Sequence, residues 1–211
     1  MNTMKQLLCL TILLSLACLW PQGAWAQTGP KETVEAANAR LHKLVSQPAA
    51  EGSAAATRRD EQLRQIVTSL LDLDYMAEKA LGRRWAERTA EERTQYLTLM
   101  RQLVERSYLR QARSRADYQI RFGQVQLSRQ GQEAEVESTL HVTKQGRREE
   151  VEVIYSLRRT NGQWRVVDVE TDGASTVRNY RAQFGRIIKG QGFPELLNRM
   201  RRRLAEGATD L

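Results

Sequence analysis

Three carboxylates near the end of a predicted strand are the residues of this sequence whose types and spacing best fit a catalytic or metal-binding site. Asp168, Glu170 and Asp172 alternate with other residues, so they project from one face of that strand. Paired carboxylates can serve as general acid and base, or they can hold a metal ion. Because the strand ends at Gly173, where side chains are usually exposed, a solvated strand end is the simpler interpretation. An enzyme that uses Asp168 and Glu170 stays open as an alternative.

Other residues that carry chemistry are few. His42 and His141 are the only histidines, and they fall on a predicted helix and a predicted strand. Both cysteines, Cys9 and Cys18, belong to an N-terminal segment that we expect to be removed. Serine nucleophile motifs and glycine-rich phosphate loops are absent from the sequence. We therefore expect no catalytic residue, no metal site and no cofactor, and we expect that the protein is not an enzyme.

The first 26 residues have the pattern of a secretory signal. Lys5 precedes an apolar run over residues 7–19, and Ala24-Trp25-Ala26 matches a cleavage site with small residues at both ends. The run is shorter than the roughly 20 residues that a membrane-spanning helix needs. We expect residues 1–26 to be cleaved and residues 27–211 to form one soluble, exported domain. The alternatives are an uncleaved membrane anchor and acylation at Cys18.

The charge of the chain is strongly positive. Lys and Arg number 33 against 25 Asp and Glu, a net charge of +8, of which the segment after residue 26 keeps +7 because the signal holds only Lys5. A basic exported protein favours anionic surfaces such as lipid headgroups. Nucleic acid is not an expected partner outside the cytoplasm. The bland alternative is that the charge serves solubility alone.

Two kinds of periodicity divide the chain into elements that must position these residues. Apolar residues at helical spacing predict helices over 32–46, 58–70, 73–82, 89–113 and 176–189, and from about 194 onward. Thr89 and Glu92 match a capping box, and Gly82 matches a helix end. The helix over 89–113 has an apolar face that spans about half its circumference, which indicates that it contacts two packing partners.

From Tyr118 the apolar period changes to two, which predicts β-strands. Turns at Gln145-Gly146 and Asn161-Gly162 separate the alternating runs. Helices, then strands, then helices predict a single α+β domain, with a twisted antiparallel sheet of about four strands packed against several helices.

Several spaced blocks resemble those of a known family. They are Tyr75-Met76-Ala77, Leu81-Gly82, Trp85, Thr89, Glu92-Arg93, Tyr108, Gly162-Gln163-Trp164, Val167-Asp168-Val169, Gly173-Ala174-Ser175 and Asn179-Tyr180-Arg181-Ala182-Gln183-Phe184. Through these blocks, residues 60 to 205 are similar to the MlaC, or toluene-tolerance, family of periplasmic phospholipid carriers. The resemblance implies a deep apolar cavity for lipid tails between the sheet and the helices.

The same resemblance implies partners and a location. It implies a periplasmic shuttle that carries phospholipid between an outer-membrane lipoprotein complex and an inner-membrane ABC transporter with an MCE-type component, and so maintains outer-membrane lipid asymmetry. We expect a monomer. Thr176 stands where the family usually has leucine, which leaves open another envelope lipid, such as a hopanoid, as cargo.

Residues that contact lipid tails should be apolar, mostly large, and on faces that converge. This criterion predicts Tyr75, Met100, Val104, Tyr108, Val153, Tyr155, Trp164, Tyr180, Phe184 and Ile188. Plain core packing is the alternative for each of them.

Arg181 lies at the edge of the apolar stripe of the helix over 176–189, because each residue turns the helix by about 100°. A charge in that position pairs with an acid such as Asp168 or Glu170, contacts a lipid phosphate at the cavity mouth, or lays its stem along apolar surface. We predict an acid as its partner, with a headgroup at the cavity mouth as the second possibility.

Overall fold

The computed structural model describes residues 28–47, 49–50, 52–114, 118–144 and 147–206. The predicted signal peptide, residues 1–26, lies outside these ranges. No helix in the described part of the chain is long and apolar enough to cross a membrane. The helices are α1 (Pro30–Val45), α2 (Ala54–Leu70), α3 (Leu73–Leu81), the 3-10 helix η1 (Gly82–Trp85), α4 (Ala90–Ser114), α5 (Thr176–Gln191) and α6 (Phe193–Glu206). The strands are β1 (Tyr118–Leu127), β2 (Glu133–Lys144), β3 (Arg147–Thr160), β4 (Gln163–Thr171) and β5 (Ala174–Ser175).

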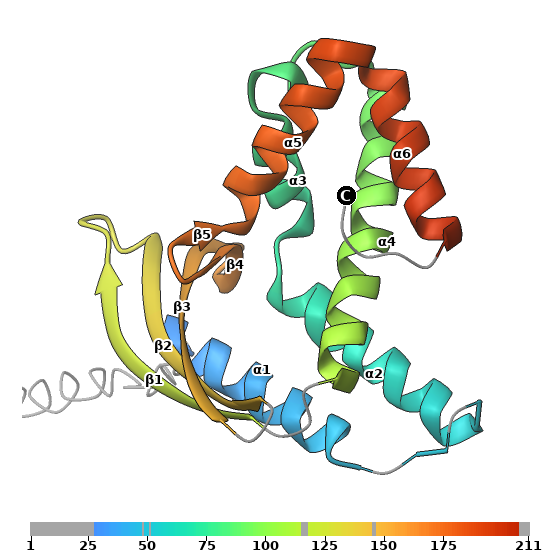
Figure 1. The fold of residues 1–211 in the computed structure, drawn as a ribbon. Helices are drawn as coiled ribbons and strands as arrows, with labels where there is room; N and C mark the ends of the chain where they lie inside the picture. Colours follow the sequence, from blue (N-terminus) through green and yellow to red (C-terminus); the bar gives the residue numbers. More distant parts are fainter. Residues whose placement is uncertain (1–27, 48, 51, 115–117, 145–146, 207–211) are drawn as a thin grey trace, which may run out of the picture.

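The strands form one antiparallel sheet in which each strand pairs with the next along the chain (Figure 1). Val136, Tyr155 and Val169 lie in one row across β2, β3 and β4. Successive side chains of a strand point to opposite faces, so the residues next to these three lie on the other face of the sheet. Asn161 and Gly162 both have positive φ, at 52° and 79°, as the tight turn between β3 and β4 requires. The predicted α+β fold is confirmed. The fifth strand is only two residues long, too short to leave a periodic signal.

The helices cover the inner face of the sheet and extend beyond it, and α5 and α6 form a hairpin at the far end (Figure 1). The predicted capping box is present: Glu92 N–H donates to Thr89 Oγ1 at 3.2 Å, and Thr89 N–H donates to Glu92 Oε2 at 3.0 Å. Gly82 follows α3 with φ of 59°, a conformation that favours glycine. Only α2 begins clearly earlier than expected, at Ala54, where Ser53 accepts a hydrogen bond from Ala56 N–H.

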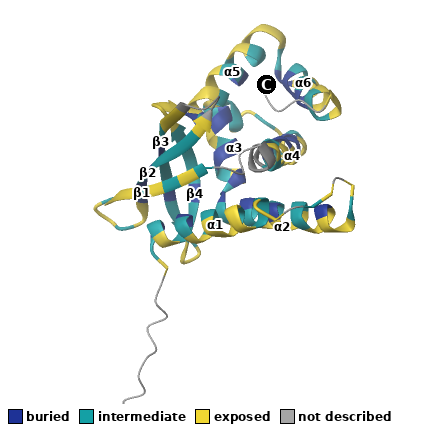
Figure 2. Ribbon diagram, turned by 60° about the horizontal axis from the view of Figure 1, so that its bottom comes forward, coloured by how far each residue is buried: buried dark blue, intermediate teal, exposed yellow. Residues whose placement is uncertain are grey.

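An aromatic cluster fills the space where α3, α4, α5 and α6 meet. Tyr96 and Phe184 are both 0% exposed and pack edge to face, with ring centroids 6.0 Å apart. Phe193 packs on Tyr96 from α6, at 6.2 Å. The Tyr96 hydroxyl donates to the Ala77 carbonyl at 2.9 Å, so the buried ring leaves no polar group unpaired. Figure 2 shows buried residues on the sides of these helices that face one another.

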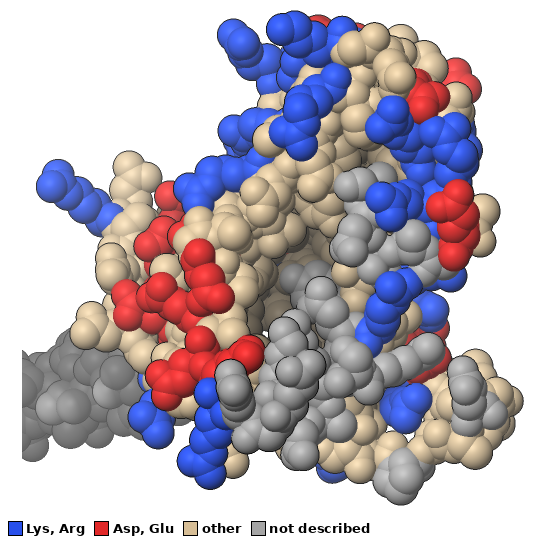
Figure 3. Space-filling view, in the orientation of Figure 1, with Lys and Arg blue, Asp and Glu red and all other residues tan. Residues whose placement is uncertain are grey.

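Charge is distributed unevenly over the fold. The α5–α6 hairpin, residues 176–206, carries eight Lys and Arg against two Glu, a net charge of +6. The sheet region, residues 118–175, carries eight against nine Asp and Glu, a net charge of −1. On the outer face of the sheet, acids line up on β2, β3 and β4: Glu135, Glu137, Glu150, Glu152 and Glu170. Figure 3 shows acidic side chains over the sheet and basic side chains over the helical end.

Candidate functional site

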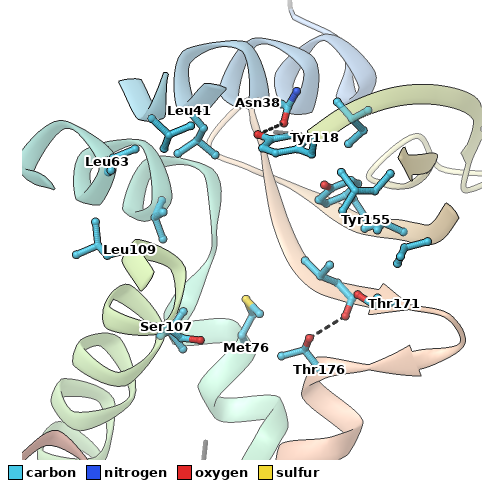
Figure 4. A pocket seen from close by; sticks show the side chains of 18 of the residues that line it. Asn38, Leu41, Leu63, Met76, Ser107, Leu109, Tyr118, Tyr155, Thr171 and Thr176 are labelled. Atoms are coloured by element: carbon cyan, nitrogen blue, oxygen red, sulfur yellow. Dashed lines mark hydrogen bonds between the residues drawn. The ribbon is translucent and has the colours of Figure 1, made fainter. Parts of the chain in front are cut away.

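A cavity of about 390 Å³ lies between the inner face of the sheet and the helices α1 to α5. Its size falls in the usual range for ligand pockets, roughly 300 to 1,000 Å³. Figure 3 shows the surface hollowed between the sheet and α4, and Figure 4 shows side chains from the surrounding elements pointing into the space. The lining residues are Asn38, Leu41, Val45, Leu63, Val67, Met76, Val104, Ser107, Leu109, Tyr118, Ile120, Leu140, Val151, Val153, Tyr155, Val169, Thr171, Thr176 and Tyr180.

Several polar groups along the cavity wall are hydrogen-bonded to one another or to the backbone. Tyr118 Oη donates to Asn38 Oδ1 at 2.9 Å, which joins β1 to α1 across the wall (Figure 4). Thr176 Oγ1 donates to the Val169 carbonyl at 2.9 Å. Burial raises the pKa of the Tyr155 phenol to about 12, so this hydroxyl stays neutral at physiological pH. The wall therefore offers an uncharged, largely apolar surface.

Four of the predicted tail-contact residues line this cavity. They are Val104 of α4, Val153 and Tyr155 of β3, and Tyr180 of α5. Tyr180 also stacks on Phe184, with centroids 5.4 Å apart, so one face of its ring supports the core while the residue borders the cavity. Whether these side chains contact a lipid stays a prediction.

The other predicted residues lie elsewhere. Met100 and Phe184 are in the packed core, and Trp164 and Ile188 pack against that core, partly buried. Two cations lie over the Tyr75 ring, with the Arg158 guanidinium 4.2 Å and Lys79 Nζ 4.9 Å from its centroid. The side chain of Tyr108 lies outside the described residues. A large apolar residue on an inward face can thus belong to solid core as easily as to the cavity.

The sequence reasoning missed the contribution of the first two helices. Leu41 and Val45 of α1, with Leu63 and Val67 of α2, close one side of the cavity. Leu41, Leu63 and Val67 belong to apolar stripes that are visible in the sequence. The missing information was that these stripes face the sheet, which only the tertiary arrangement supplies.

The carboxylates that suggested chemistry have structural partners. Asp168 Oδ1 accepts hydrogen bonds from the backbone N–H of Val169 at 2.8 Å and of Val177 at 3.1 Å. Its other oxygen accepts from the Ser175 hydroxyl, and Ser175 Oγ in turn accepts from Arg178 N–H at the start of α5. A carboxylate at a helix N-terminus satisfies free N–H groups and favours the helix dipole. Asp168 therefore ties β4 to the first turn of α5.

Glu170, the second carboxylate of the enzyme hypothesis, forms an ion pair with Arg178 of α5, at 2.7 Å. The pair is exposed and on the outer face of the sheet, away from the cavity lining. Among the described residues, no group of three or more His, Cys, Asp or Glu side chains could hold a metal ion. The geometry thus gives these acids the task of attaching α5 to the sheet.

Arg181 has a partner that differs from the prediction. Its Nε–H donates to the Lys79 carbonyl at 2.8 Å, in the last turn of α3. The side chain also packs against Gly82, where an added Cβ would lie 3.5 Å from Nε. Carbonyls at a helix C-terminus lack helical partners and attract cations, so a guanidinium suits this position. The predicted pairing with Asp168 or Glu170 was wrong, because both acids are already engaged at the N-terminus of α5.

Comparison with known proteins identifies the family of this chain. A family model described as the MlaC protein matches residues 35–202. The chain belongs to the MlaC family. No curated protein sequence matches it.

Among solved structures, a phospholipid-binding protein from Ralstonia solanacearum, determined in complex with a phospholipid, is similar to this MlaC-family chain with a TM-score of 0.69. The two chains share 22% sequence identity, and the match covers 85% of this chain and 98% of the other. At this identity the likeness establishes a shared fold. Within that fold, Thr176 lies on the cavity wall.

Proposed function

We propose that this MlaC-family protein binds phospholipid, with acyl chains in the cavity between the sheet and α1 to α5. The cavity carries the proposal, because its wall is uncharged, mostly aliphatic and aromatic, and built from nearly every element of the fold. Two further observations support it: the family of the chain, and the phospholipid bound by the Ralstonia solanacearum protein of the same fold.

The free energy gained by removing acyl chains from water explains why such a protein needs partners. Two acyl chains that remove on the order of 30 methylenes from water, at about 0.8 kcal/mol each, would gain roughly 24 kcal/mol. This exceeds the practical limit for net affinity, roughly 18 to 21 kcal/mol, so ordering and solvation terms must offset much of it. Release into water would still be slow. A carrier of this kind unloads only where another apolar path is offered.

We infer a shuttle on this basis. The chain carries its lipid through the periplasm between an outer-membrane lipoprotein complex and an inner-membrane ABC transporter with an MCE-type component, and it works as a monomer. The signal-like residues 1–26 support export, and the family supports the two partners. Transfer requires no bond to be made or broken in the carrier. The structural tasks of Asp168 and Glu170 agree with a carrier that has no catalytic residue.

A second cargo is favoured by one observation. Thr176, in place of the leucine usual in the family, lies on the cavity wall and places a polar atom there. Its hydroxyl is held by the Val169 carbonyl, which leaves its methyl group and the space of the missing leucine atoms to the ligand. A bulkier envelope lipid such as a hopanoid is therefore the alternative cargo.

Mass spectrometry of organic extracts from the purified protein tests the proposal and identifies the cargo. We expect phospholipid in the extract, and a polycyclic lipid would support the alternative. A protein that yields no lipid, and that takes up none from phosphatidylglycerol vesicles, contradicts the proposed function.

Two matched variants on β3 locate the lipid. Val153 points into the cavity and Ile154, the next residue, points to the outer face. Val153→Trp should reduce the lipid content several-fold because the indole occupies the space of an acyl chain, whereas Ile154→Trp should retain it. Equal lipid content in both folded variants would place the lipid outside this cavity.

A further inference from the structure

The α5–α6 hairpin presents a basic groove that the cavity does not account for. Two adjoining hollows lie along the hairpin and share Ile187 of α5 and Arg199 of α6. Arg186 of α5 lines one hollow, and Arg202, Arg203 and the single acid Glu206 of α6 line the other. Arginines from both helices therefore border a concave strip in which Ile187 is an apolar contact point. We call this strip the hairpin groove.

Two of the groove arginines are available for a ligand. Within the part of the chain that the structure describes, the side chains of Arg186 and Arg203 form no hydrogen bond or ion pair. Each belongs to a hairpin with a net charge of +6, which is most of the net charge of +8 of the chain. Holding like charges together disfavours the folded state, and an anion bound between them would relieve that repulsion.

The hairpin already shows how it can hold a carboxylate. Glu195 Oε1 accepts from Arg199 Nε at 3.1 Å and from an Arg202 terminal nitrogen at 2.8 Å. These hydrogen bonds hold the pKa of Glu195 below its ordinary value, and the bond from Arg202 contributes more than the bond from Arg199. Planar guanidinium groups match the geometry of carboxylates, and several of them on one surface bind acidic segments.

We propose that the hairpin groove docks an acidic segment of a partner protein, with carboxylates on Arg186 and Arg203 and an apolar side chain on Ile187. A groove with cations on both rims and an apolar contact between them fits a protruding chain segment. The proposal goes beyond lipid binding, because none of the groove residues lines the lipid cavity.

Fluorescence anisotropy with a short labelled peptide of Glu with interspersed Leu tests the groove in the full-length chain. The double variant Arg186→Glu and Arg203→Glu should weaken peptide binding on the order of tenfold or more, because it reverses the two charges that meet the ligand. Raising the ionic strength should weaken binding of the unaltered protein as well. The neutral pair Arg186→Gln and Arg203→Gln should give a smaller loss, and neither pair breaks a side-chain hydrogen bond or ion pair within the described structure.

A control with the same change in net charge distinguishes the groove from general attraction. Arg121 and Arg129 are exposed on β1 and in the turn that follows it. The double variant Arg121→Glu and Arg129→Glu should leave peptide binding within about twofold of the unaltered protein. An equal loss in both charge-reversed pairs would overturn the proposal.

Lipid vesicles separate the remaining outcomes. Sedimentation with vesicles of phosphatidylcholine and phosphatidylglycerol should depend less on the groove arginines than peptide binding does. If vesicle binding is lost in the groove variant while peptide binding is not, the hairpin is a membrane surface and the proposal fails. The lipid extracted from the groove variants should match that of the unaltered protein. Failure of the docking proposal would leave this lipid content unchanged, whereas failure of the proposed lipid binding would show as an extract without lipid.

Discussion

One end of α4 lies in solid core and the other borders a cavity. Around Tyr96, the helices α3 to α6 fill the available space with aromatic and large aliphatic side chains. Around Val104 and Leu109, the same helix faces a volume of about 390 Å³. At about 24 cal/mol per Å³, a dry void of that size would cost on the order of 9 kcal/mol. This is comparable with the whole stability of an ordinary domain, roughly 5 to 15 kcal/mol.

The contrast between the packed end and the cavity end of α4 indicates which part of the fold provides stability and which part provides function. The packed half provides a rigid support, so the other half can keep a wall that does not close on itself. A ligand or water in the cavity removes much of the cost of the void. Substitutions in the packed half should therefore change the free energy of unfolding, whereas substitutions in the cavity wall should change lipid retention.

The largest effect is expected from Phe184→Ala. Phe184 is 0% exposed and contacts the rings of Tyr96 and Tyr180, so the change leaves a void that rigid neighbours cannot fill. We expect a loss of about 3 to 5 kcal/mol in the free energy of unfolding. Urea denaturation of delipidated protein measures it. A loss below 1 kcal/mol would show that the helical half is not tightly packed.

Asp168→Asn tests the joint between the two halves. The variant removes the charge that faces the N-terminus of α5 and weakens a set of three hydrogen bonds, so we expect a loss of about 1 to 3 kcal/mol. Asp172→Asn is the matched control, because Asn tolerates the φ of 46° at that position and its amide oxygen can still accept the hydrogen bond from Glu152 N–H. An unchanged stability accompanied by loss of an enzymatic turnover would instead restore the enzyme hypothesis.

Arg181→Ala distinguishes a packing role from a headgroup role. Loss of the hydrogen bond to the Lys79 carbonyl, together with the favourable charge at the end of α3, should cost about 0.5 to 1.5 kcal/mol. Lipid retention, measured by extraction and mass spectrometry, should be unchanged. The opposite pattern, reduced retention at constant stability, would assign Arg181 to the cavity mouth.

The smallest change in stability is expected in the cavity wall itself. Leu140 of β2 lines the cavity and is only half-buried, so Leu140→Ala enlarges an existing space instead of opening a new one. We expect a loss of about 1 kcal/mol or less in delipidated protein. The exchange of lipid with vesicles should become faster, and the transfer of a fluorescent phospholipid measures its rate. Equal destabilisation by Leu140→Ala and Phe184→Ala would erase the distinction between the two halves.

Local signals in the sequence predict most of this fold. Periodicity locates the helices and the four long strands, and the capping box at Thr89 and the glycine at position 82 mark element ends where the structure has them. These features depend on neighbouring residues in the chain. For that reason a single sequence is enough to predict them.

The cavity was only partly predictable, because a hollow is a property of how elements are spaced. Val153 and Tyr155 were predictable as inward residues of a strand, yet Met100 and Phe184 have the same character and lie in solid core. Arg181 shows a second limit. Its helical angle was correctly placed at a stripe edge, but its partner belongs to another helix about one hundred residues earlier, at Lys79.

The opposite signs of the sheet face and the α5–α6 hairpin give the molecule a permanent dipole moment. The acids of β2, β3 and β4 lie on one side of the fold and the excess cations on the other (Figure 3). A molecule of this kind orients in an external field and adsorbs to ion-exchange resins of either sign. At low ionic strength, neighbouring copies attract head to tail despite their shared positive net charge, and added salt disperses them.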